Sequence, residues 1–220
     1  MKFSVLAIIM TVSLVGACGL NNKLNPPAAS GSGNVKTDQR NIVGFKKIKA
    51  ENAIELNVTI TKGFAITVAA DDNVIANVRT ELQGDTLVVS LKDKVSTRSK
   101  INVTVSMPEL TDLDAAGAAT CVVSGINAED LNIHATGAAK VKLEGTVKTL
   151  NAKAVGASSV DAENLKAETA NVESVGASNI TVAASEELKA DASGASSVTY
   201  IGDPKQLKQN ASDASTIQKK

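Results

Sequence analysis

A near-regular repeat fills the C-terminal half of this 220-residue chain and constrains its fold more than any other feature. Each repeat carries a glycine, or once an aspartate, followed by alanine and a small residue. These positions are spaced by 20, 19, 20, 18 and 19 residues. They are Gly117, Gly137, Gly156, Gly176, Gly194 and Asp213. A fixed period of about 19 residues predicts a stacked solenoid.

Apolar columns within the repeat indicate which kind of solenoid to expect. Apolar residues recur two positions apart, which is typical of strands and not of helices. One such column stands four residues after each corner: Cys121, Val141, Val160, Ile180, Val198 and Ile217. We therefore predict an all-β fold, a parallel β-helix with coils of about 19 residues, each made of two short strands joined at a Gly-Ala-Ser corner.

The five glycines are the predicted structural corners of these coils. The chain has to turn sharply there, at backbone angles where a Cβ atom is costly. Alanine and serine follow because a stacked corner leaves little room. The variation in repeat length is expected in a second, looser turn, for example residues 145–148 or 183–187.

Residues 41–108 alternate between apolar and polar and predict an N-terminal part rich in β-hairpins. One hairpin is expected from residues 54–60 and 64–68 around the turn at 61–63, and a strand from 74–78. Another turn is expected at residues 83–85. The pattern leaves open whether this region forms early coils of the same β-helix or a separate antiparallel sheet.

The first residues have the features of an export signal. Lys2 is followed by an apolar run over residues 3–15, which is too short to span a bilayer. The run ends in Gly16-Ala17-Cys18, which resembles the lipobox of bacterial lipoproteins. We therefore predict a signal peptide over 1–17, a lipidated Cys18 with a flexible tether over 18–40, and a solenoid domain over 41–220. That domain divides into N-terminal strands, 41–108, and repeats, 109–220.

Composition argues against several classes of protein. Two cysteines and one histidine are too few for a disulfide scaffold or a common zinc site. The net charge is zero and aromatic residues make up 2% of the chain, which argues against a nucleic-acid partner. No phosphate-binding glycine motif occurs.

Candidate catalytic and metal-binding residues have simpler explanations. Ser158, Ser178 and Ser196 are equivalent corner residues without the Gly-x-Ser-x-Gly context of a hydrolase nucleophile. The only histidine, His134, is expected to face outward, and Cys121 to be a buried small hydrophobe. The acidic pairs Asp71-Asp72 and Glu129-Asp130 are expected to be solvated loop tips. We therefore expect no catalytic, cofactor or metal site, and no cofactor.

Several motifs resemble one bacterial family. They are the corners Gly156-Ala157-Ser158, Gly176-Ala177-Ser178 and Gly194-Ala195-Ser196, the opening Phe45-Lys46-Lys47-Ile48, and Met107-Pro108-Glu109-Leu110 before the repeats. From Phe45 to the C-terminus the chain resembles the head GIN domain family of auto-transporter adhesins, a domain family of unknown function. The resemblance implies a right-handed parallel β-helix-like fold, often on envelope lipoproteins, and no established activity. The Gly-Ala-Ala corners at 117 and 137, and Asp213, depart from the pattern.

These observations favour a non-enzymatic, lipid-anchored protein of the cell envelope that acts as an adhesin-like interaction module. Its expected partners are the membrane, through Cys18, and an unidentified envelope, surface or polysaccharide partner. Two alternatives remain open, a structural envelope module that self-associates and a polysaccharide-binding protein. Gly19 after the lipobox cysteine indicates the outer membrane by the sorting pattern of Gram-negative lipoproteins, facing either the periplasm or the cell surface.

Overall fold

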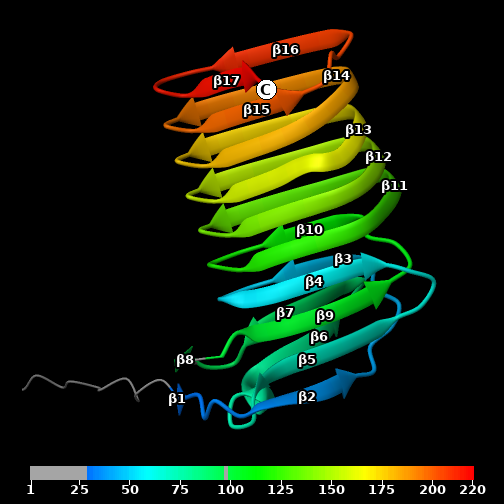
Figure 1. Ribbon diagram of the computed structural model, residues 1–220, viewed down its shortest axis with the longest axis vertical. Coiled ribbons are helices and arrows are strands. Elements are labelled where there is room, and N and C mark those ends of the chain that lie inside the picture. Colours follow the sequence, from blue (N-terminus) through cyan, green and yellow to red (C-terminus); the bar gives the residue numbers. More distant parts are fainter. Residues whose placement is uncertain (1–28, 97–98) are drawn as a thin grey trace, which may run out of the picture.

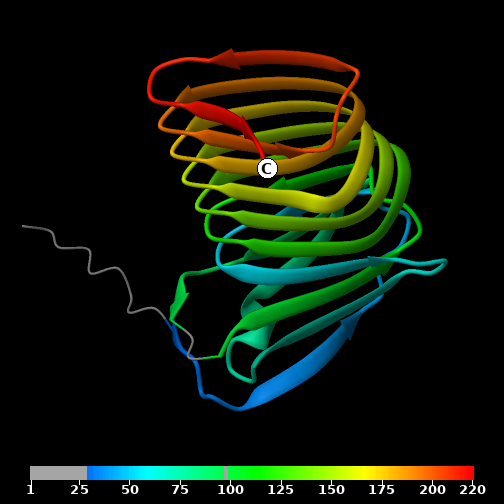
Figure 2. The ribbon, with the colours of Figure 1, turned by 45° about the horizontal axis from the view of Figure 1, so that its top comes forward.

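Coils of β-strand lie on top of one another along a single axis in the computed structural model, which describes residues 29–96 and 99–220 (Figure 1). Each coil is flattened, with a tight corner on one side and a wider bend on the other (Figure 2). The long strands each run from one corner to the next: β11 (Thr120–Gly137), β12 (Lys140–Gly156), β13 (Ser159–Gly176) and β14 (Asn179–Gly194). The predicted all-β fold of parallel stacked coils is confirmed.

Neighbouring coils pair in parallel and in register. Val160 pairs with Val141 on one side and Ile180 on the other, so the predicted apolar column is one row, buried from Cys121 to Val198 and half-buried at Ile217. The column is completed at the C-terminal end by β15 (Ser197–Ile201) and β17 (Thr216–Lys219), with β16 (Gln206–Ala211) on the opposite face. The register shifts only around the wider bend, as the variation in repeat length predicts.

The N-terminal strands answer the question that the sequence leaves open, because they form both coils and antiparallel strands. One coil consists of β3 (Lys47–Ala50) and β4 (Ile54–Ile60). The next is formed by β7 (Thr86–Leu91) and β9 (Ile101–Met107), and both coils pair in parallel. The coil of β3 and β4 lies between that of β7 and β9 and that of β10 (Asp112–Ala115) and β11. Order along the chain and order in the stack therefore differ here.

Antiparallel strands extend the two sheets at the N-terminal end of the stack. On one face β5 (Ala65–Asp71) pairs with β9, and β2 (Val35–Arg40) pairs with β5. On the other face β6 (Val78–Gln83) forms a hairpin with β7 around Gly84 and Asp85, at the predicted turn. Two short strands, β1 (Ala29–Ser30) and β8 (Val95–Ser96), pair separately. Within the described ranges no helix is long and apolar enough to span a bilayer.

The hairpin predicted from residues 54–60 and 64–68 is wrong. β9 lies between β4 and β5 and pairs in parallel with β4 and antiparallel with β5. Alternation along a strand shows which residues face the core, but it does not show which strand lies alongside. Pairing with β9 allows Ile54, Leu56 and Val58 to continue the buried interior of the solenoid.

Two further predictions need correction. Residues 75–77 form a short 3₁₀ helix, η1 (Ile75–Asn77), and not part of a strand over 74–78. The predicted tether over 18–40 is too long, since β2 lies within it and is paired along its whole length with β5. The side chains of β2 are mostly exposed, so its sequence carries little hydrophobic signal. Residues 1–28, with the predicted signal peptide and Cys18, lie outside the described residues.

The interior narrows toward the corner, and the residue sizes follow. Six residues before the corner the buried positions are mostly leucine, as at Leu131 and Leu150. Two residues before it they are only alanine or serine: Ala115, Ala135, Ala154, Ser174 and Ala192. Aromatic packing is confined to the N-terminal end, where the rings of Phe45 and Phe64 have centroids 4.9 Å apart.

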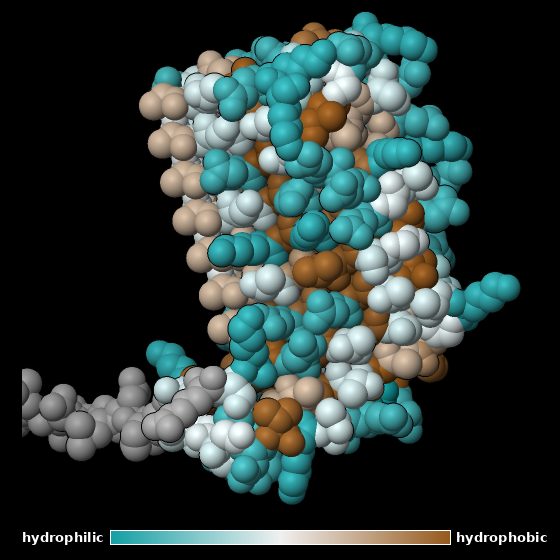
Figure 3. Space-filling model, viewed as in Figure 1, coloured by the Kyte–Doolittle hydropathy of each residue, from teal (hydrophilic) through white to brown (hydrophobic). Residues whose placement is uncertain are grey.

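The corners depend on a close approach between successive coils. Gly176 has φ +89°, and a Cβ atom there would lie 3.0 Å from the carbonyl oxygen of Gly156. That oxygen accepts a hydrogen bond of 2.7 Å from the backbone N–H of Ala177. Asn52 (φ 70°) and Asp213 (φ 60°) occupy the same place in other coils, and both residue types tolerate this left-handed conformation. The alanine after each corner is exposed, and these alanines form the pale brown column at the left edge of Figure 3.

At the wider bend, the tightest contact involves Gly145. It has φ +140°, and a Cβ atom there would lie 2.1 Å from the carbonyl oxygen of Ile126 in the preceding coil. We expect Gly145→Ala to lower the free energy of unfolding by about 3 kcal/mol, measured by chemical denaturation. Gly63→Ala is the matched control, because a Cβ atom at Gly63 has nothing within 4 Å. Equal stability of the two variants would contradict this geometry.

The inward and outward assignment can be tested at two adjacent residues of β13. Val160 is 1% exposed inside the stack, whereas Ser159 faces outward and is half-buried. We expect Val160→Asp to destabilise the protein by about 4 kcal/mol, because the carboxylate would be buried without a partner. Ser159→Asp should change stability by less than about 0.5 kcal/mol. Similar losses in thermal stability for both variants would refute the assignment.

Candidate functional site

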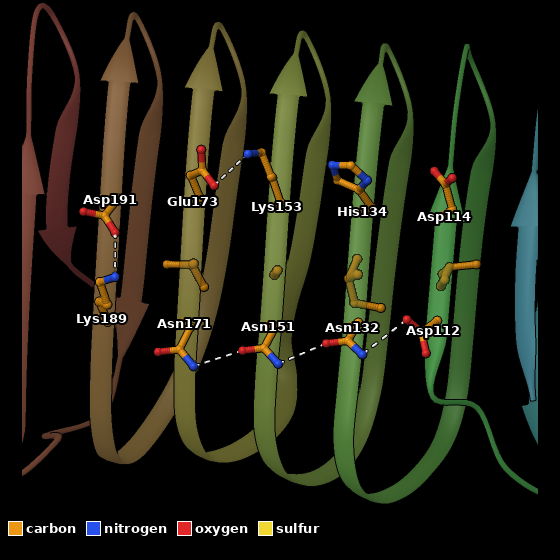
Figure 4. Close-up of a pocket in the computed structure, with 14 residues that line it drawn as sticks. Asp112, Asp114, Asn132, His134, Asn151, Lys153, Asn171, Glu173, Lys189 and Asp191 are labelled. Atoms are coloured by element: carbon orange, nitrogen blue, oxygen red, sulfur yellow. Dashed lines mark hydrogen bonds and ion pairs between the residues drawn. The ribbon is translucent and has the colours of Figure 1, made fainter.

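Two rows of outward-facing side chains enclose a groove of about 540 Å³ over the strands β10 to β14 (Figure 4). The rows stand five and three residues before each corner, and the register of the coils aligns them. The floor between them is formed by the inward-facing position of each strand. Strands in a sheet are about 4.8 Å apart, so five strands give a groove about 19 Å long, parallel to the stacking axis.

The first row, called the amide row here, is a hydrogen-bonded ladder (Figure 4). Its members are Asp112, Asn132, Asn151, Asn171 and Lys189. Asn171 Nδ2 donates to Asn151 Oδ1 at 3.0 Å, and Asn151 Nδ2 donates to Asn132 Oδ1 at 3.0 Å. Asn132 Nδ2 donates to Asp112 Oδ1 at 3.2 Å. All amides point their dipoles the same way and end on a carboxylate, an arrangement in which each bond strengthens the next.

The second row, called the charged row, carries both signs. Its members are Asp114, His134, Lys153, Glu173 and Asp191. Lys153 Nζ lies 2.8 Å from Glu173 Oε2, and Asp191 Oδ2 lies 3.6 Å from Lys189 Nζ of the amide row. The groove is lined by four carboxylates and two ammonium groups in all, so its charge is negative.

The groove is a shallow, rigid, polar surface. Its floor residues are closed to solvent: Leu113 is 1% exposed, Ile133 2%, Ala152 4% and Val172 3%. Each of its five strands is hydrogen-bonded on both sides, so the backbone is already satisfied. Among the described residues, no group of three or more His, Cys, Asp or Glu residues is placed to hold a metal ion. The arrangement can therefore offer a ligand fixed hydrogen-bonding groups and charge.

A second groove, of about 690 Å³, follows the wider bend. Its floor contains Val147, Ala167 and Ala184, each 4% exposed, and it is more apolar than the first groove. One rim carries Lys148 and Glu129, and the carboxylate of Glu129 raises the pKa of that lysine above its usual value. Its floor side chains are small, and the regular hydrogen-bonding row of the first groove is missing from its lining.

The corner serines are structural in the described fold. Ser158 Oγ lies 3.0 Å from Ala135 O of the preceding coil and 3.1 Å from Val155 O, as donor to these carbonyls. Ser178 and Ser196 are buried in the same way, with Oγ 3.0 Å from Ala154 O and 2.8 Å from Ser174 O. These hydroxyls link one coil to the next. They donate hydrogen bonds to backbone carbonyl oxygens in the narrow part of the interior.

The other residues considered as catalytic or metal-binding candidates lie in different parts of the structure. Cys121 is fully buried, and burial raises its thiol pKa to about 12, so the thiolate is not formed near neutral pH. His134 is exposed, as expected, and lies in the charged row of the groove. Glu129 and Asp130 are exposed. The expectation is wrong for Asp71, which is 1% exposed and whose carboxylate oxygens have no hydrogen-bond partner among the described residues.

The amide row is the feature that the sequence reasoning missed. Its signal is present in the repeat, since Asn132, Asn151 and Asn171 each stand five residues before a corner glycine. The apolar columns define the fold, and the polar columns between them define the surface. A polar column of identical residues is therefore the pattern that could have located this groove.

Residues 44–204 match the model of the family described as "Putative auto-transporter adhesin, head GIN domain". The chain belongs to this family. The resemblance inferred from the corner motifs is thereby confirmed, and the match begins just before β3 and spans the whole groove. A comparison with curated proteins finds no match.

Solved structures show that this head GIN domain shares its fold with proteins of Bacteroides and Parabacteroides species. A "putative adhesin" from Bacteroides fragilis is 21% identical, with a TM-score of 0.74, over 88% of this chain and 100% of that one. A "putative lipid binding protein" from Parabacteroides distasonis is 17% identical, with a TM-score of 0.55, over 88% and 99% of the two chains. A "putative adhesin" from the same species is 17% identical, with a TM-score of 0.54, over 88% and 100%. At these identities the likeness establishes the fold alone.

Proposed function

We propose that this head GIN domain is a non-enzymatic, adhesin-like binding module of the bacterial envelope. The observation that carries the proposal is the groove, a polar surface about 19 Å long built on a rigid stack of in-register coils. Its side chains are held by neighbouring side chains, and its floor is sealed. The family description, which names an adhesin, supports the same function and a place at the surface or envelope of the cell.

The coil architecture suits a binding module because surface and core are separate. Alternate residues of each strand face outward, so the side chains of the groove can be substituted while the inward apolar columns preserve the fold. The hydroxyl groups that the sequence offers as nucleophiles are instead bonded to backbone carbonyls. This division of roles supports a surface that binds a partner and does not transform it.

We further propose that the domain is attached to the outer membrane through lipid on Cys18. The support is the sequence: a positive start, an apolar run of signal-peptide length and a small-residue approach to the cysteine. The described chain begins with β1 and β2, at the end of the stack where the antiparallel strands lie (Figure 1). Residues 18–29 can reach at most about 40 Å when extended. Attachment there would direct the repeats and the groove away from the bilayer.

Lipid anchoring can be tested with the two cysteines of the chain. We expect Cys18→Ser to abolish incorporation of labelled fatty acid and to move the protein from the membrane fraction to the soluble fraction, because acyl chains supply the attachment. Cys121→Ser is the matched control, since this buried thiol is not a lipidation site and its variant should remain labelled. Retention of the Cys18 variant in the membrane fraction would rule out this anchor.

The binding function can be tested on cells. We expect deletion of the gene to reduce adhesion of the bacteria to polysaccharide-coated and cell-coated surfaces by several-fold. Restoring the full chain should restore adhesion, whereas restoring a chain with Val160→Asp should restore much less of it, because the buried carboxylate destabilises the stack. Unchanged adhesion after deletion, on every surface tested, would refute the proposed function.

A further inference from the structure

We propose that the groove over β10 to β14 binds a linear, uncharged, hydroxyl-rich polymer, of the chemical class of a neutral polysaccharide, lying along the stacking axis. This inference rests on the proposed function and names the ligand class of the same site. Four properties of the groove support it: the regular spacing of its side chains, their unused hydrogen-bonding groups, its negative charge and its closed floor.

The groove repeats along its length. Each coil adds one residue to the amide row and one to the charged row, at intervals of about 4.8 Å. A partner that presents the same chemical groups at the same interval can contact the side chains of every coil at the same time. Sugar rings in an extended chain recur at a comparable interval, so successive rings can meet successive coils.

The amide row retains hydrogen-bonding capacity. A primary amide has two N–H donors and two acceptor lone pairs. In the ladder Asn151 uses one N–H and one lone pair, which leaves one of each. Asn171 uses one N–H, and no bond to its Oδ1 occurs among the described residues. Paired donors and acceptors at fixed spacing complement neighbouring hydroxyl groups, each of which also donates and accepts.

The charge of the groove disfavours an acidic polymer. Four carboxylates line it against two ammonium groups, and Lys153 is already paired with Glu173. A polyanion such as a uronic acid polymer or a nucleic acid would meet a surface of like charge. The carboxylates at one end, Asp112 and Asp114, can accept hydrogen bonds from hydroxyl groups without requiring a cationic partner.

The floor disfavours an extended peptide. Peptides gain affinity by adding a strand to a free sheet edge or by burying anchor side chains in pockets. The strands β10 to β14 have no free edge, since each is paired on both sides. The floor residues are at most 4% exposed, so no pocket opens between the rows. A hydroxyl-rich chain needs neither feature.

The lining contains no phenylalanine, tyrosine or tryptophan, so rings cannot stack on an aromatic platform. Affinity therefore has to come from many hydrogen bonds, and it should depend on chain length. We expect millimolar binding of single hexasaccharides, with the apparent affinity rising at least about tenfold from disaccharide to hexasaccharide. Chains longer than the five coils should gain little more.

The experiment uses the full chain, purified in detergent and isotope-labelled on asparagine, so that side-chain amide signals can be followed by NMR. The probes are oligosaccharides of increasing length from linear β-glucan and mannan, with polygalacturonate and a Ser/Thr-rich peptide for comparison. We expect the neutral oligosaccharides to shift the side-chain signals of Asn132, Asn151 and Asn171 saturably. The signals of Asn57 and Asn102, on the opposite face, should not shift.

Variants test whether the amide row itself is responsible. Asn151→Thr combined with Asn171→Thr should weaken hexasaccharide binding at least about tenfold. The matched control is Asn57→Thr with Asn102→Thr, which removes an outward amide pair joined at 3.1 Å between β4 and β9. The control should bind as the unaltered chain does. If the ladder variant does not fold, the shifts in the unaltered chain decide the outcome.

Three results would overturn the inference: no shift of the ladder signals with any neutral oligosaccharide, tighter binding of polygalacturonate or the peptide in the same groove, or equal affinity of the two double variants. A loss of adhesion on gene deletion together with any of these results would overturn only the ligand class. Unchanged adhesion would instead overturn the proposed function, whatever the NMR result.

Discussion

The structure depends on hydrogen bonding between parallel coils held in one register. At four corners the alanine N–H donates to the carbonyl oxygen of the corner glycine in the preceding coil at 2.7 Å, as from Ala177 to Gly156. This contact sets the separation of the coils and excludes a Cβ atom at the glycine. With the register set, apolar residues stack into continuous columns inside, and polar residues stack into rows outside. The core and the groove are two results of the same alignment.

Most of the repeat region could be predicted from the sequence, because each coil repeats the same evidence. The column through Val141, Val160 and Ile180 needs only the spacing of the corners. The N-terminal coils were harder to predict, because the sequence pattern of each occurs only once. Asn52 forms a corner equivalent to Gly117 without sharing its residue type, and alternation in β4 did not reveal β9 as its partner.

The candidate site could be predicted only in part. His134 was expected to face outward, and it does, but the groove it lines needs the register of five strands. The hydrogen bond between Asn151 and Asn171 joins residues 20 positions apart, and its geometry follows from the pairing of β12 and β13. A column of identical polar residues marks the position of such a row, whereas its unused donors and acceptors become evident only when the coils are stacked.

The coil of β3 and β4 lies between two coils made later in the chain, and this has a kinetic consequence. The coil gains neighbours on both sides only after residues up to 124 are available, so the first stable unit requires long-range closure and forms slowly. Each later coil then docks on a finished template through nearest-neighbour contacts. Folding should therefore be slow until the chain up to residue 124 is available, and it should afterwards advance one coil at a time toward the C-terminus.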